Sequence, residues 1–244
     1  MEELADAGHR GTVAEVEPGL YGITIKPSVG IGQRALLVQT SSGNLLWDPN
    51  GYLDDDLVAA VHVLGGLAAV AASHPHMFGV QVEWSHRFGG VPVYVQAADR
   101  EWLQRDDPVI TIWEEKTEVL PGVVLHRIGG HFPGSAVAHF VGADGRGVLL
   151  SGDTVACTPD EHWVSFMRSF PNKIPCRRPL WRRWLTGCCN STSTGSTTTS
   201  AGRSSATPPS GCADPPTATS RGFVGTSTTS PVDHAWTRFF LQWS

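Results

Sequence analysis

The chain has 244 residues, with 18 lysines and arginines against 23 aspartates and glutamates and a formal net charge of −5. This length suits one α/β domain, and a mildly acidic chain without a basic patch disfavours nucleic acid as a partner. No apolar run approaches the ~20 residues that a membrane span needs. The start at Met1–Asp6 lacks the apolar stretch of a secretion signal, and only Cys157 of the five cysteines precedes Pro175. We therefore expect a cytoplasmic protein whose body has no disulfide framework.

The first half of the chain alternates between strand and helix patterns. Apolar or alternating runs predict strands at 19–25 (an edge strand), 33–39, 45–47, 67–72 and 91–95. Asp54–Asp56 open a helix that runs through Val61, because carboxylates stabilise the N-terminal end of a helix dipole. A second helix is expected at 80–88, and a third begins within 97–103. This alternation favours a layered α/β fold.

Two histidines, His74 and His76, lie where the predicted strand 67–72 ends. An alternating pair at a strand end can direct both imidazoles at one point, which a metal ion requires. Pro75 fixes one backbone angle between them and stiffens the turn. The same pattern also occurs on surface loops that bind no metal. It therefore indicates a metal site only together with further ligands.

Two turns in the second half carry such ligands. His131 lies in the glycine-rich turn 129–135, and Asp153 ends the buried strand that starts at Val148. Further strands are expected within 117–126, about a Pro-Gly turn, and at 136–141. Two further histidines lie on these strands. We expect His126 to be structural and not a ligand, and the pattern assigns no role to His139.

The order of His-x-His, a lone histidine in a Gly-His-x-Pro-Gly turn and a Ser-Gly-Asp turn resembles the metallo-β-lactamase superfamily of hydrolases, over about residues 19–175. The resemblance implies a four-layer αββα sandwich and a zinc site made by His74, His76, His131 and Asp153. A three-nitrogen site with an open position suits a catalytic zinc. Asp153 would orient the attacking water or act as a base. Implied substrates are esters, thioesters, lactones or phosphoesters.

The sequence departs from the family pattern at the second metal site. The pattern HxHxDH ends in two residues that help hold a second ion, and Phe78 and Gly79 stand there and cannot coordinate. We therefore expect one zinc ion, which argues against the two-metal phosphodiesterases. Glu83 could replace a lost ligand, although a solvated helix carboxylate is the commoner role. The resemblance also implies that Asp48, at a strand end, supports the loops that carry the metal ligands, and an Asx-turn before Pro49 explains this aspartate equally well.

The composition changes after Pro175. Serine, threonine, proline, glycine and arginine dominate there, and the only acidic residues are Asp214 and Asp233. Such a stretch cannot bury enough apolar surface to offset chain entropy, so we divide the chain into a domain at 1–175 and a disordered low-complexity tail at 176–244. We favour a further hypothesis, that the tail is read in a shifted frame. The encoding DNA, read one base earlier, would then stay open and encode helices, and early stop codons would refute the idea.

The sequence thus predicts a metal-dependent hydrolase that acts on a small molecule through a zinc-activated water. The alternative is a vestigial or metal-binding member of the fold that lost turnover with its second site and its C-terminal part. A redox variant with iron in the same cluster is a weaker option, because it would need the full second set of ligands. The fold alone does not choose among these activities.

Overall fold

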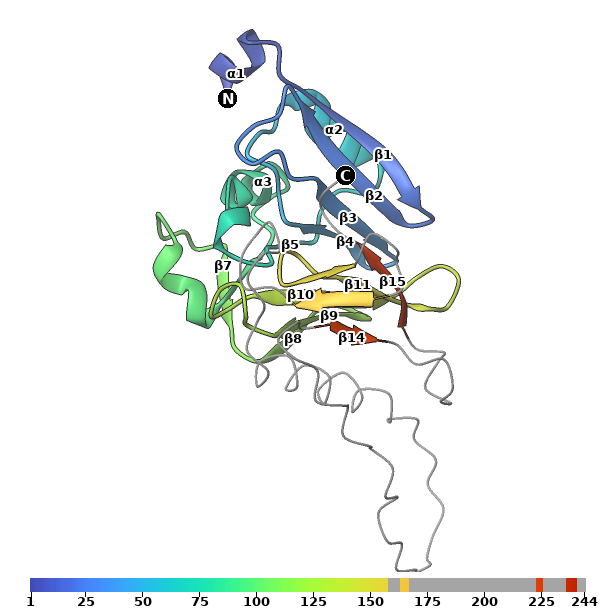
Figure 1. The fold of residues 1–244 in the computed structure, drawn as a ribbon. Helices are drawn as coiled ribbons and strands as arrows, with labels where there is room; N and C mark the ends of the chain where they lie inside the picture. Colours follow the sequence, from blue (N-terminus) through green and yellow to red (C-terminus); the bar gives the residue numbers. More distant parts are fainter. Residues whose placement is uncertain (158–162, 167–222, 226–235, 241–244) are drawn as a thin grey trace, which may run out of the picture.

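Two β-sheets packed face to face form the body of the protein (Figure 1). The computed structural model describes residues 1–157, 163–166, 223–225 and 236–240. The seven-stranded sheet follows chain order: β1 (Arg10–Glu17), β2 (Leu20–Lys26), β3 (Ala35–Thr40), β4 (Gly43–Trp47), β5 (Ala69–Ala71), β6 (Val93–Gln96) and β7 (Ile110–Trp113). The five-stranded sheet has the order β15 (Trp236–Phe240), β11 (Gly147–Leu150), β10 (Ala136–Val141), β9 (Val123–Arg127) and β8 (Lys116–Leu120). A third sheet contains β12 (Val155–Cys157), β13 (Trp163–Phe166) and β14 (Phe223–Gly225).

Alternation of side chains along the strands builds the core between the two large sheets. In β3, Leu36 and Val38 belong to this core, while Leu37 between them belongs to the core on the opposite face. Successive side chains of a strand point to opposite faces, which explains the division. Leu125 and Phe140 of the second sheet complete the inner core. Because β3 is covered on both faces, its sequence is a continuous apolar run.

Helices cover the outer face of the seven-stranded sheet. The longer ones are α2 (Asp55–Val63) and α3 (Gln81–Arg87), and a short α1 (Glu2–Asp6) precedes β1. Asp54 caps α2, since its Oδ1 accepts a hydrogen bond of 2.8 Å from the Leu57 backbone N–H. Leu57 of α2 and Trp84 of α3 pack with Leu37 of the sheet in the outer core. The turns η1 (Pro75–Met77) and η2 (Ala97–Trp102) are 3-10 helices.

These layers confirm the predicted α/β sandwich, and one expectation about its strands was wrong. Residues 19–25 do not form an edge strand, because β1 pairs with β2 and occupies the edge itself. All eight residues of β1 are exposed or half-buried, so no apolar alternation marks this strand in the sequence. The helix expected at 97–103 is the 3-10 helix η2, in which the Gln96 side chain accepts a 2.6 Å hydrogen bond from the Ala98 N–H.

The predicted tail lies largely outside the described residues. Two of its segments are described: β14 pairs with β13, and β15 lies parallel to β11 at the end of the second sheet. The domain boundary at residue 175, the disorder of 176–244 and the shifted reading frame therefore stay predictions.

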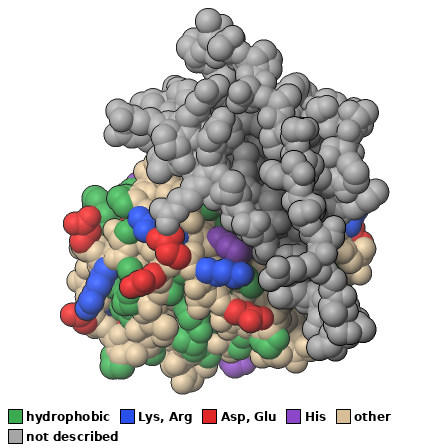
Figure 2. All heavy atoms as spheres, turned by 90° about the horizontal axis from the view of Figure 1, so that it is seen from below, with side chains coloured by type: hydrophobic (Ala, Val, Ile, Leu, Met, Phe, Trp, Pro, Cys, Tyr) green, Lys and Arg blue, Asp and Glu red, His purple; other side chains and the backbone are tan. Residues whose placement is uncertain are grey.

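The described surface carries both signs of charge. On the face seen in Figure 2, acidic, basic and apolar side chains are interspersed over the described part of the molecule. This mixture agrees with the small formal net charge of −5. Within the described ranges, the helices are all too short or too polar to cross a lipid bilayer.

Candidate metal centre

Three histidines and an aspartate meet at one place in the fold. The ligand atoms of His74, His76, His131 and Asp153 all lie within 4.8 Å of one another. Nε2 of His74 lies 3.5 Å from Oδ2 of Asp153, and Nε2 of His131 lies 3.8 Å from the same oxygen. The structure therefore brings together the four residues that the sequence indicates as ligands, although they come from three separate loops.

The topology explains why these loops meet. β4, β5 and β6 are parallel, so their carboxyl ends lie at the same edge of the first sheet. Asp48 follows β4, His74 follows β5 and Asp99 follows β6 at that edge. The loop before β10 supplies His131, and the turn after β11 supplies Asp153. Loops at strand ends on a packed scaffold are the usual place for binding residues.

The His-x-His segment leaves β5 and turns at once into a 3-10 helix. His74 is extended, with φ −168° and ψ 171°, and Pro75 occupies the first turn of η1, where its missing N–H costs nothing. His76 lies within this helix. The rings of His74 and His76 meet edge to face with centroids 5.1 Å apart, and each also lies edge to face on His131. The 3-10 turn therefore brings the imidazole rings of His74 and His76 together, as their alternating spacing in the sequence predicts.

A set of polar contacts holds His74 in place. Asp48 is fully buried, and its Oδ1 accepts a short hydrogen bond from the Ser73 backbone N–H. Ser73 Oγ lies 2.8 Å from Nδ1 of His74, so Nε2 is the ring nitrogen that faces Asp153. Gly152 leaves room for Ser73, since a Cβ there would come within 2.5 Å of Ser73 Oγ. Asp48 is therefore linked to His74 through Ser73, and its supporting role at a metal site stays a prediction.

A second buried carboxylate, Asp99, fastens the turn that carries His131. Its Oδ1 accepts a 2.7 Å hydrogen bond from the Gly134 N–H, and the side chain is 1% exposed. Burial raises the pKa of Asp99, and the Gly134 N–H opposes that shift. Within the turn, the Phe132 N–H donates to Ser135 Oγ at 2.7 Å. The sequence gives no sign of Asp99's role, because the contact joins residues 35 positions apart.

The protonation and hydrogen bonding of the cluster suit a metal ion. Burial lowers the pKa of His74, against the raising effect of Asp153, and burial together with His131 lowers the pKa of His76. A lowered pKa favours the neutral imidazole, which is the form that binds metal. Nε2 of His74 is buried and makes no hydrogen bond with any described residue. Three imidazoles and a carboxylate are ligands that zinc accepts.

The described residues offer one such group and no second one beside it. Phe78 is 9% exposed and packs in the outer core with α3, and Gly79 has a φ of 34°. Glu83, which the sequence considers as a substitute ligand, pairs with Arg105 at 2.7 Å and lies outside the cluster. Its role as a helix carboxylate is therefore the one that the structure supports.

The other histidines among the described residues lie outside the cluster. His126 and His139 are neighbours on β9 and β10, with ring centroids 6.4 Å apart. Burial, with the nearby Lys116 charge, lowers the pKa of His126 to about 4. This agrees with the structural role predicted for His126, since a neutral imidazole is tolerated in a half-buried sheet position. His62 is exposed on α2, and His86 pairs with Asp107 at 3.2 Å.

Replacing Asp48 is expected to lower the stability of the domain. Asp48→Ala removes the acceptor of the buried Ser73 N–H, which costs about 1–3 kcal/mol of unfolding free energy. The φ of 54° at this position further disfavours alanine. Urea unfolding followed by circular dichroism measures the loss. Asp48→Asn keeps the shape and one acceptor, so it should lose less, and an alanine variant as stable as the wild type would contradict the role given to Asp48.

The sandwich of two sheets, with a His/His/His/Asp group on its connecting loops, has the metallo-β-lactamase fold. The chain is similar to the solved DIM-1 metallo-β-lactamase, with a TM-score of 0.53 and 14% identity over 74% of this chain and 84% of that one. It is also similar to TMB-1, with a TM-score of 0.50 and 16% identity over 61% of this chain and 72% of that one. At these identities the likeness establishes the fold alone.

A relative in sequence is the uncharacterized protein YmaE of Bacillus subtilis (strain 168). The two are 41% identical over 178 residues, which make up 72% of this chain and 65% of YmaE. The chain therefore spans about 65% of the length of this relative. No known protein-family model matches the chain.

Proposed function

We propose that the protein is a metal-dependent hydrolase that cleaves an ester, thioester, lactone or similar bond of a small molecule. The observation that carries this proposal is the cluster of His74, His76, His131 and Asp153 in a metallo-β-lactamase fold, with ligand atoms within 4.8 Å. Zinc is the proposed ion, because it prefers such nitrogen and oxygen ligands. The proposal includes a cytoplasmic location, which rests on the cysteine pattern.

The residues of the cluster have separate parts in this proposal. The three histidines would hold the ion through ring nitrogens, and Ser73 keeps the His74 ring oriented through Nδ1. When bound, zinc supplies a Lewis acid that polarises a carbonyl and lowers the pKa of water toward ~7. Asp153, which is 4% exposed, would orient the attacking water and take its proton on the carboxylate.

A second candidate is a metal-binding domain without turnover. Phe78 and Gly79, at the positions where the superfamily motif has a metal-binding aspartate and histidine, favour it. A single ion with an open position is nevertheless sufficient for hydrolysis in other zinc enzymes, since one Lewis acid can both polarise the substrate and activate water. We therefore place the hydrolase first.

A hydrolysis screen separates the two candidates. The full chain, His76→Ala and His62→Ala are assayed on a panel of esters, thioesters and lactones in the presence of zinc. His62 is exposed and lies outside the cluster, which makes its variant the matched control. We expect turnover by the wild type and the control, and a loss of more than about 100-fold in His76→Ala. Bound metal without turnover of any substrate would favour the non-catalytic candidate.

A further inference from the structure

One phenyl ring contacts all three imidazoles of the candidate metal centre. The ring of Phe132 stacks on His74, with centroids 5.7 Å apart and an angle of 26° between the planes. It meets His76 edge to face at 4.9 Å and His131 edge to face at 5.1 Å. Aromatic rings attract one another in these arrangements at centroid distances of about 4.5–7 Å. Phe132 therefore lies against each of the three side chains that would hold the ion.

The backbone around Phe132 is held by hydrogen bonds. Its N–H donates to Ser135 Oγ at 2.7 Å, and its carbonyl oxygen accepts a 3.2 Å hydrogen bond from the Ser135 N–H. The carbonyl oxygen of the next residue, Pro133, accepts a 3.0 Å hydrogen bond from Nε of Arg127. These bonds fix the point at which the phenyl ring leaves the turn.

The 3-10 helix η2 supports this turn at two points. Trp102, its last residue, meets the Phe132 ring edge to face with centroids 5.5 Å apart. Asp99 of the same helix accepts the 2.7 Å hydrogen bond from the Gly134 N–H. The helix therefore holds both the Phe132 ring and the backbone two residues after it.

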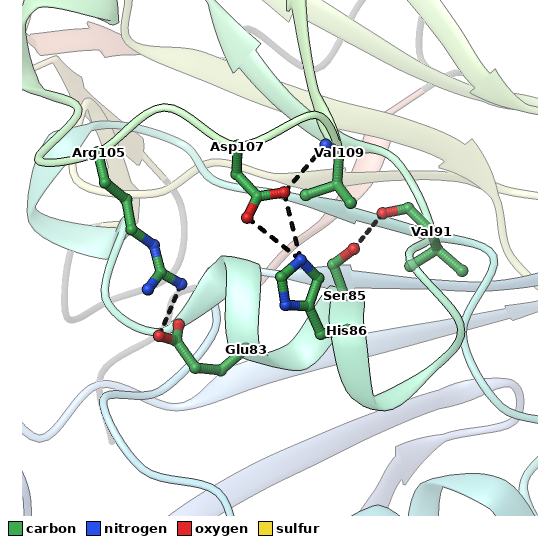
Figure 3. A network of polar contacts seen from close by, with 7 residues as sticks. All are labelled: Glu83, Ser85, His86, Val91, Arg105, Asp107 and Val109. Carbon is green, nitrogen blue, oxygen red and sulfur yellow. Dashed lines mark hydrogen bonds and ion pairs between the residues drawn. The ribbon is translucent and has the colours of Figure 1, made fainter.

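The segment after η2 is tied to α3. Figure 3 shows Glu83 and His86 of α3 turned toward Arg105 and Asp107 of this segment. Glu83 bonds to Arg105 at 2.7 Å, and His86 lies 3.2 Å from Asp107. Because α3 follows η1 in the chain, these pairs connect the segment of the first two histidines with the helix that supports Phe132.

We infer that Phe132 is a positioning residue, whose ring holds the three imidazoles in one arrangement that suits a metal ion. Ligands that are held in place beforehand lose less conformational freedom when the ion binds, so the affinity rises. The Gly-His-x-Pro-Gly turn of the superfamily leaves this position open, so the motif itself does not demand phenylalanine here. The inference rests on the proposed function, because it concerns the same metal centre.

The zinc affinity of the full chain, measured by competition with a chromogenic chelator, tests this inference. Phe132→Leu keeps an apolar side chain and removes the ring. It should weaken zinc binding about tenfold or more, since changes around metal ligands typically cost about 10–100-fold. Phe132→Tyr keeps the ring, and the pocket of about 560 Å³ that Phe132 lines leaves room for a hydroxyl. This conservative variant should stay close to the wild-type affinity.

Phe88→Leu is the matched control. Phe88 is also half-buried and also packs on a histidine, since its ring centroid lies 4.4 Å from that of His62. Neither residue belongs to the cluster. The control should bind zinc as the wild type does.

The cobalt(II) forms of these proteins give a readout that a merely structural role would not move. The visible absorption bands of cobalt depend on the geometry of its ligands. Phe132→Leu should therefore shift or weaken these bands, and Phe132→Tyr should restore them.

Nuclear magnetic resonance of the metal-free proteins tests the ring contacts themselves. The current of the phenyl ring displaces the imidazole C–H resonances of the cluster, so Phe132→Leu should move all three sets. The resonances of His126, which lies outside the cluster on β9, should stay in place and serve as the internal control.

Unmoved imidazole resonances, or equal losses of affinity in Phe132→Leu and Phe132→Tyr, would overturn the inference. A Phe132→Leu chain that does not fold, as judged by circular dichroism, would assign the ring a role in folding and overturn it as well. Hydrolysis with an unchanged zinc affinity in Phe132→Leu would refute the inference alone. The expected zinc, cobalt and resonance results without hydrolysis of any substrate would refute the proposed activity alone.

Discussion

His74→Ala is expected to remove metal binding and hydrolysis together. His74 is 2% exposed, and its Nε2 lies 3.5 Å from Asp153. Alanine deletes one of the three imidazoles that are proposed to hold the ion and leaves a buried space in its place. Outer-shell changes around metal ligands cost about 10–100-fold in affinity, so loss of a ligand should exceed that range. Competition with a chromogenic zinc chelator measures the affinity.

A control variant tests whether removing any histidine lowers the affinity for metal. His86→Ala removes an exposed ring that lies outside the cluster and pairs with Asp107. It should bind metal as the wild type does. If His74→Ala keeps the wild-type affinity while its fold is intact by circular dichroism, the four residues do not form a metal site.

Asp153→Asn is expected to separate metal binding from catalysis. Asparagine keeps the shape and one oxygen, so the variant should still bind a metal ion, although less tightly. It cannot accept a proton, and the rate should fall by about 10²–10⁴-fold, as for the loss of a general base. The measurement is kcat at saturating zinc on the best substrate of the hydrolysis screen.

Asp144→Asn is the control for this change, since Asp144 lies in an exposed turn and pairs with Arg146 at 2.5 Å. Its kcat should match that of the wild type. An Asp153→Asn enzyme with undiminished kcat would show that Asp153 takes no part in moving the proton, and the histidines alone would then have to account for the activity.

The sequence predicts those parts of the fold that local patterns encode. The apolar run of β3 and the acidic start of α2 each carry a local physical signal, and both elements form as expected. The His-x-His segment and the two later turns are likewise readable, because each ligand lies beside glycine or proline at a strand end. β1 has no such signal, since its side chains stay largely in solvent.

Contacts between distant segments escape this kind of prediction. Asp99 supports the turn of His131 across 35 residues, and nothing near Asp99 in the sequence suggests it. Gln81 escapes prediction for the same reason. Its buried Oε1 has no hydrogen-bond partner among the described residues, and this shows only in the folded structure. The predicted absence of a second metal site is different, because it rests on Phe78 and Gly79, which are visible in the sequence itself. The structure adds that a pocket lies where those residues stand.

The most direct measurement is the metal content of the purified full chain, by mass spectrometry after dialysis against zinc, beside His76→Ala. We predict about one zinc ion per wild-type chain, as a single three-histidine site with an open position implies, and loss of that ion in the variant. Equal and negligible metal in both proteins would contradict the account. Two ions per chain, both lost in His76→Ala, would contradict the single site.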